Sequence, residues 1–275
     1  MTAAKIEQAV NYIRSKTDVV PELCLVLGSG LGDFADGVDG EHIPYDDIPG
    51  FPISTAPSHK GLLHIGTCMG RSVVVMQGRV HMYEGYQPAE VVFPMQVMAA
   101  LGATTAILTN AAGGLDAALD VGDIVAIEDH LSIPNLSGRD PLRGPHDPAS
   151  GERFVALNKA YDPALIVTAE QVAASAGQTM QRGIYAFVVG PTFETPAEVR
   201  MLQSLGCQLV GMSTVPEVIA ARQHGLAVLA LSVVTNMAIS TTRDDRITSE
   251  QEVWDAMVEI KPRFQRLVAG ILQTI

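Results

Sequence analysis

The sequence predicts an α/β protein of three layers, α/β/α, built on a central mixed, largely parallel sheet. Short apolar runs of strand length alternate along the chain with longer amphipathic segments, an order typical of sheets covered by helices. Most of the apolar runs stop at a glycine-rich or polar loop. Ligands of such sheets bind at the carboxyl ends of the strands, so these loops are candidate sites. With 275 residues, 47% of them apolar, the chain can bury one large core, and we expect a single domain over residues 1–275.

Strands are predicted where aliphatic and β-branched residues follow one another without a helical period. The first ends at Leu27, and the others are expected at residues 62–67, 72–77, 104–109, 123–127, 183–189 and 226–235. Residues 33–57 are rich in Gly, Pro and Asp, and predict a loop with at most short strands. Residues 110–114 predict a glycine loop after their strand. Residues 133–151 carry several prolines and predict an ordered but irregular excursion.

Helices are predicted by an apolar period of 3.6 residues, which also occurs in residues 1–16. They are expected at residues 88–101, 163–176, 195–205 and 214–223, and from about 249 onward. Two of these starts carry the same signature, because Thr195 with Glu198 and Thr214 with Glu217 have capping-box spacing and a proline in the first turn. We therefore expect both threonine side chains to cap their helices.

Charge and composition exclude several classes of function. The formal net charge of −12 argues against a nucleic-acid or anionic-membrane surface, since such binding needs clustered Lys and Arg. The longest apolar run, residues 226–231, is too short to cross a bilayer, and residues 1–16 lack the apolar core of a signal peptide. Cys24, Cys68 and Cys207 are far apart in apolar surroundings, which fits neither a disulfide framework nor a metal site. We expect a cytoplasmic protein without a metal.

A loop of alternating glycines, Gly28, Gly30 and Gly32, follows the first strand. Such a loop brings uncovered backbone amides close to a ligand, and Ser29 adds a hydroxyl donor. The third glycine comes one residue too early for G-x-G-x-x-G, and the Lys-Ser/Thr pair of a P-loop is missing. Glycine turns also occur for steric reasons alone. The functional alternative is a site for a small oxyanion such as phosphate.

Three further residues could complete such a site. Arg79 and His81 lie two residues apart directly after a strand, so in an extended chain they point to one side. A guanidinium binds an oxyanion through two hydrogen bonds, and a histidine donates to it or exchanges a proton with it. Ser213 precedes a helix N-terminus, which attracts anions. The alternatives are a surface arginine beside a capping histidine, and a serine that only caps its helix.

Glu194 and Asn236 could together recognise a heterocycle. Glu194 lies outside the expected capping box of Thr195, so its carboxylate either accepts other hydrogen bonds or lies in water. Asn236 ends an almost wholly apolar strand, where an unpaired amide would cost about 1–3 kcal/mol unless it pins a turn or binds a ligand. An amide and a carboxylate match a ring edge that presents both an acceptor and N–H donors.

Seven segments that follow one another along the chain, from about residue 23 to residue 253, resemble the low-mass, trimeric class of purine nucleoside phosphorylases. They are residues 28–32, 50–52, 78–85, 109–114, 135–144, 190–195 and 210–217. In that family phosphate cleaves the N-glycosidic bond of a purine (deoxy)ribonucleoside with inversion, releasing the base and (deoxy)ribose 1-phosphate for purine salvage. The resemblance implies an enzyme with inorganic phosphate as co-substrate and no metal or organic cofactor.

The resemblance also implies roles for individual residues. Phosphate would be held by Ser29, His59, Arg79, His81, the amide of Ala111 and Ser213. Tyr83 and Met212 would contact the ribose, Tyr185 and Phe193 would line the base site, and Phe154 would reach into the neighbouring subunit of a homotrimer. Glu194 would accept from N1–H of the base, and Asn236 would bond N7 and O6. Asn236, Glu194 and His81 are then the catalytic candidates.

An amide at position 236 suits hypoxanthine and guanine, so we expect 6-oxopurine nucleosides (inosine, guanosine and, less clearly, xanthosine) as substrates. The chain departs from many relatives at Glu250, where they carry a histidine near the ribose 5′-hydroxyl; a first-turn helix carboxylate is the structural alternative. A methylthioadenosine phosphorylase is a second hypothesis, for which an aspartate in place of Asn236 would be expected. A non-catalytic purine-binding protein and a hydrolase are disfavoured, because either would make the predicted phosphate residues superfluous.

Overall fold

The computed structural model describes residues 3–56 and 59–275, and within them one mixed, 9-stranded sheet forms the centre of the molecule. The strands lie in the order β2-β3-β4-β1-β5-β8-β7-β6-β9. Their bounds are β1 Leu23–Leu27, β2 Asp39–Pro44, β3 Leu62–Cys68, β4 Arg71–Gln77, β5 Thr105–Gly114, β6 Ile124–Ser132, β7 Gln181–Phe187, β8 Leu209–Gly211 and β9 Ala227–Met237. The predicted α/β class is confirmed.

Part of the sheet closes on itself. β5 pairs with β9 in parallel as well as with β8, so β5, β8, β7, β6 and β9 form a ring of hydrogen-bonded strands. The β5–β9 register shifts between Ala112 and Gly113. A bulge of this kind bends a strand, and here it accompanies the change from neighbour β1 at the start of β5 to neighbour β8 at its end. The sheet is therefore open at β2 and closed at the other end.

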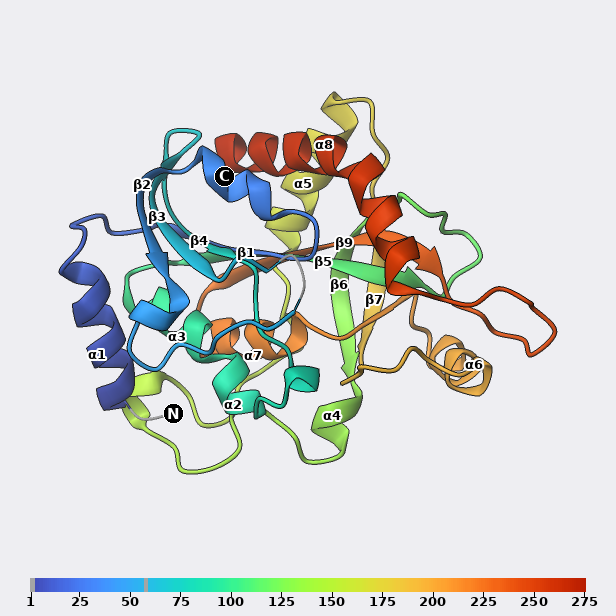
Figure 1. The fold of residues 1–275 in the computed structure, drawn as a ribbon, viewed down its shortest axis with the longest axis horizontal. Helices are drawn as coiled ribbons and strands as arrows, with labels where there is room; N and C mark the ends of the chain where they lie inside the picture. Colours follow the sequence, from blue (N-terminus) through green and yellow to red (C-terminus); the bar gives the residue numbers. More distant parts are fainter. Residues whose placement is uncertain (1–2, 57–58) are drawn as a thin grey trace.

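Helices cover both faces of the sheet, as Figure 1 shows. Their bounds are α1 Ala3–Arg14, α2 Pro88–Val91, α3 Phe93–Ala100, α4 Ile133–Leu136, α5 Pro163–Ser175, α6 Pro196–Ser204, α7 Val215–Gln223 and α8 Glu250–Thr274. α1, α2, α3 and α7 lie together on one face, whereas α5 and α8 pack against each other on the opposite face. Among the described residues, every helix is too short or too polar to span a membrane.

Several predicted boundaries are wrong in an instructive way. The expected glycine loop at 110–114 continues β5 as a strand. A Cβ at Gly114 would lie 2.6 Å from Met237 Sδ, so this glycine leaves room for a side chain of the neighbouring β9. The helix expected at 88–101 is divided at Val92, two residues before Pro94, which has no N–H to continue the hydrogen-bond ladder. The short strand β8 was not predicted, whereas β2 fits the expectation of at most short strands in residues 33–57.

The topology gathers the predicted loops at one edge. β4, β1, β5 and β9 are adjacent and mutually parallel, so their carboxyl ends meet at the same side of the sheet. Every residue of β1 is buried, as are most residues of β4 and β9, which agrees with their unbroken apolar sequence. The buried strands thus form a rigid base from which the loops at 28–32 and 78–84 and the residue Asn236 project.

Candidate active site

A cavity of about 390 Å³ lies at this edge of the sheet. Its wall is built from the ends of β1, β4, β5 and β9, the 191–194 segment, β8 with the residues after it, and the start of α8. The predicted site residues in its wall are Ser29, Arg79, His81, Tyr83, Ala111, Phe193, Glu194, Met212, Ser213 and Asn236. Residues that are far apart in sequence and were selected for their chemistry therefore line one cavity.

Three of the implied residues lie outside this wall. His59 lies directly behind it, with Nε2 3.3 Å from Ser29 Oγ. Tyr185 is fully buried beneath Gly211, and its hydroxyl lies 3.5 Å from the backbone nitrogen of Ser213, so it supports the wall and does not line it. Phe154 is 87% exposed and lies outside the cavity of its own chain.

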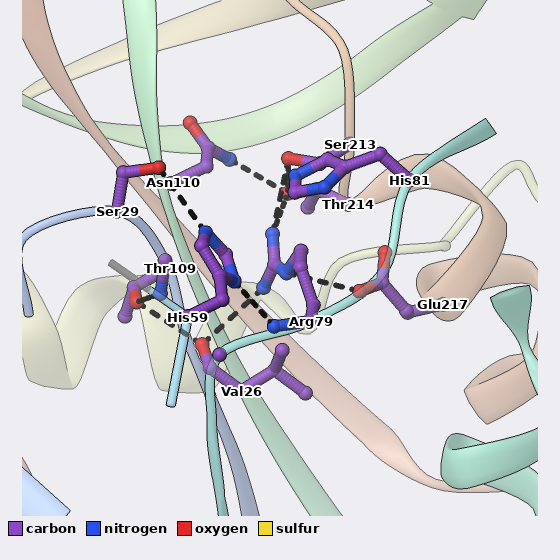
Figure 2. A network of polar contacts seen from close by, with 12 residues as sticks. Val26, Ser29, His59, Arg79, His81, Thr109, Asn110, Ser213, Thr214 and Glu217 are labelled. Carbon is purple, nitrogen blue, oxygen red and sulfur yellow. Dashed lines mark hydrogen bonds and ion pairs between the residues drawn. The ribbon is translucent and has the colours of Figure 1, made fainter. Parts of the chain in front are cut away.

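Arg79 is the most buried charged residue of the site, with 2% of its surface exposed. Its Nη1 donates to Ser213 Oγ and Thr214 Oγ1, each at 3.0 Å, and its Nη2 donates to Val26 O at 3.3 Å (Figure 2). Its Nε lies 3.1 Å from the carboxylate of Glu217, which is 3% exposed. A buried charge needs such a partner. The guanidinium is therefore held in one orientation at the cavity wall.

The capping box predicted at Thr214 and Glu217 is wrong. Thr214 has φ +73° and ψ −52°, and Val215 N donates to Ser213 O at 2.8 Å, which makes a γ-turn of the rare, strained kind. The Thr214 hydroxyl turns to Arg79 and to Asn110, whose Nδ2 lies at 2.8 Å, instead of capping α7. The box predicted at Thr195 is confirmed, since Glu198 Oε2 accepts from Thr195 N at 2.7 Å and Glu198 N donates to the Thr195 hydroxyl.

His59 is a neutral donor to Ser29. Burial, with the nearby charges of His81 and Arg79, lowers the pKa of His59 to about 3. Its Nδ1 accepts from the backbone N–H of Arg79 at 2.6 Å, so the single ring proton is on Nε2. Nε2 lies 3.3 Å from Ser29 Oγ, a contact that Figure 2 marks with a dashed line, so His59 donates to the serine oxygen. The serine oxygen thus accepts a hydrogen bond from His59, and the serine hydroxyl hydrogen can be donated to a ligand in the cavity.

His81 is oriented by an ionised carboxylate. Glu84 Oε1 accepts from His81 N at 2.7 Å and from His81 Nδ1 at 3.0 Å, and its Oε2 accepts from the backbone and hydroxyl of Thr55. Burial alone would raise the pKa of Glu84, but these hydrogen bonds together lower it to about 2. The His81 ring also stacks on Tyr83 at 4.6 Å between centroids. Its Nδ1–H and ring plane are therefore fixed.

Glu194 and Asn236 supply the acceptors of the cavity. Burial raises the pKa of Glu194. Asn236 is 6% exposed, and its Oδ1 lies 3.3 Å from the hydroxyl of Thr235. Burial, with the nearby charges of Glu84 and Glu250, raises the pKa of the Tyr83 phenol to about 12, and Glu250 also lines the cavity. The wall therefore combines a buried cation and hydroxyl donors with an amide and carboxylates. Among the described residues, no cluster of three or more His, Cys, Asp or Glu could hold a metal.

Comparison with known proteins places the chain in a family. A family model described as the phosphorylase superfamily matches residues 22–273. Purine nucleoside phosphorylase 1 of Geobacillus stearothermophilus is 44% identical over 276 positions, covering 100% of this chain and 99% of that protein. The chain belongs to the purine nucleoside phosphorylases.

Solved structures of purine nucleoside phosphorylases have the same fold as this chain. The Schistosoma mansoni purine nucleoside phosphorylase in complex with inosine is 40% identical and has a TM-score of 0.95, covering 100% of this chain and 97% of that one. A purine nucleoside phosphorylase in complex with ribose 1-phosphate is 41% identical and has a TM-score of 0.89, covering 99% of this chain and 97% of that one.

Sequence reasoning missed part of this phosphorylase's site. Asn110, Thr214 and Glu217 surround Arg79 and Ser213, yet Glu217 and Thr214 were expected to cap a helix. A usable signal exists for Glu217, because it is a lone carboxylate in a run of apolar residues that α7 buries on nearly all sides. Asn110 has the same signal as Asn236, a polar amide in a buried strand.

Proposed function

We propose that this protein catalyses the phosphorolysis of 6-oxopurine (deoxy)ribonucleosides. Inorganic phosphate attacks C1′, the C1′–N9 bond breaks, and the products are the free base and (deoxy)ribose 1-phosphate. The observation that carries the proposal is the single cavity in which Ser29, Arg79 and Ser213 lie together with Glu194 and Asn236. The relatives bound to inosine and to ribose 1-phosphate support it, since those molecules are a substrate and a product of the proposed reaction.

The proposed mechanism uses charge that develops in the transition state. The C1′–N9 bond breaks ahead of attack, so the ribosyl group becomes oxocarbenium-like and the purine takes up the electron pair of the bond. Phosphate, held by Arg79, Ser29 and Ser213 with His81 and the Ala111 amide, stabilises the first charge, and His59 acts on phosphate through Ser29. Asn236 stabilises the second through N7 and O6. Both interactions are strongest in the transition state and therefore raise the rate. No metal or organic cofactor is needed.

Glu194 and Asn236 are the proposed determinants of the base. An ionised Glu194 accepts from N1–H, a hydrogen that 6-oxopurines carry and 6-aminopurines lack. Asn236 presents a donor to O6 and an acceptor to a protonated N7. Tyr83 and Met212 contact the ribose, and Phe193 lines the base site with Tyr185 behind the wall.

One assay tests the whole proposal. Inosine, guanosine, xanthosine, adenosine and methylthioadenosine are each incubated with and without phosphate, and free base and sugar 1-phosphate are measured. We expect turnover of inosine and guanosine that depends entirely on phosphate. Turnover without phosphate indicates hydrolysis, preferred turnover of methylthioadenosine indicates the second hypothesis, and tight binding of base without turnover indicates a binding protein.

We propose further that the enzyme is a cytoplasmic homotrimer. The exposure of Phe154 supports a residue that reaches a neighbouring subunit. Cys24, Cys68 and Cys207 are free and buried, which suits a reducing compartment.

A further inference from the structure

The hydroxyl of Thr214 has no freedom of direction. Its oxygen lies 3.0 Å from Arg79 Nη1, 2.8 Å from Asn110 Nδ2 and 3.2 Å from Ser213 Oγ. Arg79 and the Asn110 amide nitrogen are donors only, so they occupy both lone pairs of the hydroxyl. The Asn110 orientation follows from its other end, where Oδ1 accepts from the Ser232 hydroxyl at 2.8 Å. The hydrogen of Thr214 is left with one partner, Ser213 Oγ.

The Ser213 hydroxyl is constrained by its neighbours in the same way. Its oxygen accepts from Arg79 Nη1 at 3.0 Å and from the Thr214 hydroxyl at 3.2 Å, so both of its lone pairs are occupied. Its own hydrogen must point away from both donors, and Ser213 is part of the cavity wall. The Tyr185 hydroxyl, 3.5 Å from Ser213 N, also lies within reach of the Ser213 side chain. Ser213 can therefore donate to a ligand or to Tyr185, and it cannot accept from a ligand. Figure 2 shows these groups converging around the Arg79 guanidinium.

Formal charge around Ser213 does not by itself favour an anion. The positive charge of Arg79 is balanced by the buried carboxylate of Glu217 at 3.1 Å, and Glu84 adds a second carboxylate behind His81. His59 is neutral. Oriented donors must then supply much of the attraction, because a fixed dipole in a buried site does not have to reorganise when the anion binds.

We propose that Thr214 is a positioning residue for phosphate: held in its strained turn, it forces Ser213 to act as an obligate donor, so that this part of the cavity binds an unprotonated oxyanion oxygen. Thr214 does not line the cavity and acts only through Ser213. The strained φ of Thr214 is the conformation that keeps its hydroxyl among Arg79, Asn110 and Ser213. The inference rests on the proposed function, in which phosphate is the co-substrate.

The test is a double-mutant cycle with Thr214→Val and Ser213→Ala. Valine keeps the β-branched shape and removes the hydroxyl, after which Ser213 is free to turn its hydrogen away from the cavity. We expect the KM for phosphate to rise about tenfold, an amount that corresponds to about 1.4 kcal/mol, with the KM for inosine changed less than about twofold. In the Ser213→Ala background, Thr214→Val should add almost nothing. Thr214→Ser, which keeps the hydroxyl, should restore the phosphate KM.

Additive effects in the cycle, or an unchanged phosphate KM in Thr214→Val, overturn the proposal, because a structural role would be independent of the Ser213 hydroxyl. If Thr214→Val does not fold, Asn110→Ala is the second variant, because it removes the amide that donates to the Thr214 oxygen and so frees the Thr214 hydroxyl to turn away from Ser213. The KM for phosphate should rise in this variant too, and an unchanged KM overturns the proposal. Thermal shift with inorganic phosphate gives a readout without turnover. Wild-type protein that is stabilised by phosphate but has no phosphorolytic activity contradicts the proposed function alone.

Discussion

Single side chains in this site are defined by which of their hydrogen-bonding atoms remain free. Ser29 Oγ is bonded to His59, and Ser213 Oγ is bonded to Arg79 and Thr214, so each serine can offer its own hydrogen to a ligand. Asn236 keeps an amide at the wall, and Glu194 keeps a carboxylate there. Such groups prefer a ligand that completes their hydrogen bonds, and a ligand that leaves them unpaired is rejected at a cost of about 1–3 kcal/mol.

Asn236→Asp should shift the preference toward 6-aminopurines. A carboxylate accepts from an exocyclic amino group but cannot donate to O6, so kcat/KM should fall for inosine and rise relative to it for adenosine by about tenfold or more. Steady-state kinetics with both nucleosides measure the ratio. Asn236→Ala is the control, since it loses inosine activity without gaining adenosine activity. An unchanged ratio in Asn236→Asp would exclude the role assigned to this amide.

Glu194 should set the acid limb of the pH profile. Burial raises its pKa, so the carboxyl takes up its proton at a higher pH than an ordinary glutamate, and the protonated form no longer accepts from N1–H. We expect kcat/KM for inosine to fall as the pH decreases through that raised pKa. Glu194→Gln should have lower activity and lack this limb, while the titration of phosphate, common to both proteins, remains. Parallel profiles for the two proteins would contradict the assignment.

Two helices, α6 and α7, share the same sequence pattern at their starts but begin with different structures. α6 begins at an exposed capping box, in which Thr195 and Glu198 satisfy each other. α7 begins at a buried strained turn, and its glutamate leaves the helix end to neutralise Arg79. Propensity and capping rules describe an isolated helix end. Tertiary burial overrides them at Glu217, because a carboxylate is bound more strongly by a buried guanidinium than by the backbone amides of a helix end.

Substitution of the two glutamates should separate these uses. Glu217→Gln leaves the Arg79 charge uncompensated, and the free energy of unfolding should fall by about 3 kcal/mol in urea denaturation. Glu198→Gln, the matched control, retains the capping box and should change stability much less. Phosphate should stabilise Glu217→Gln more than the wild-type protein, because it supplies the missing negative charge. If the free energy of unfolding falls no further in Glu217→Gln than in Glu198→Gln, the buried ion pair is no more important for stability than the exposed capping box.

At the scale of the whole molecule, the closed ring of β5, β8, β7, β6 and β9 brings the 191–194 segment and Ser213 toward the ends of β1 and β4. The cavity is open, and Phe154, which the family resemblance assigns to an active site, lies outside it. Aromatic residues are enriched at interfaces between proteins, and the proposed trimer requires this side chain to be exposed on the single chain.

The proposed trimer predicts a solution mass of three times the 29.2 kDa chain, measured by light scattering. Phe154→Ala should raise the KM for inosine severalfold and leave the KM for phosphate nearly unchanged, because only the nucleoside would contact a neighbour. Phe193→Ala, at the cavity wall of the same chain, is a control that should weaken the nucleoside in any oligomeric state. A fully active monomer would exclude the role of Phe154.

The sequence alone determined the α/β class, most of the strands and the chemical types in the site, because strand periodicity, glycine spacing and polar residues after apolar runs are local signals. Parallel strands end at the same edge, so Ser29, Arg79 and Asn236 could be assigned to one site from the sequence. Only the tertiary structure decided the ring closure of the sheet, the turn at Thr214 and the pairing of Arg79 with Glu217. Arg79 and Thr214 are 135 positions apart, and a contact over that distance depends on how buried charges and hydroxyls find partners in the packed core, for which a single sequence carries no local pattern.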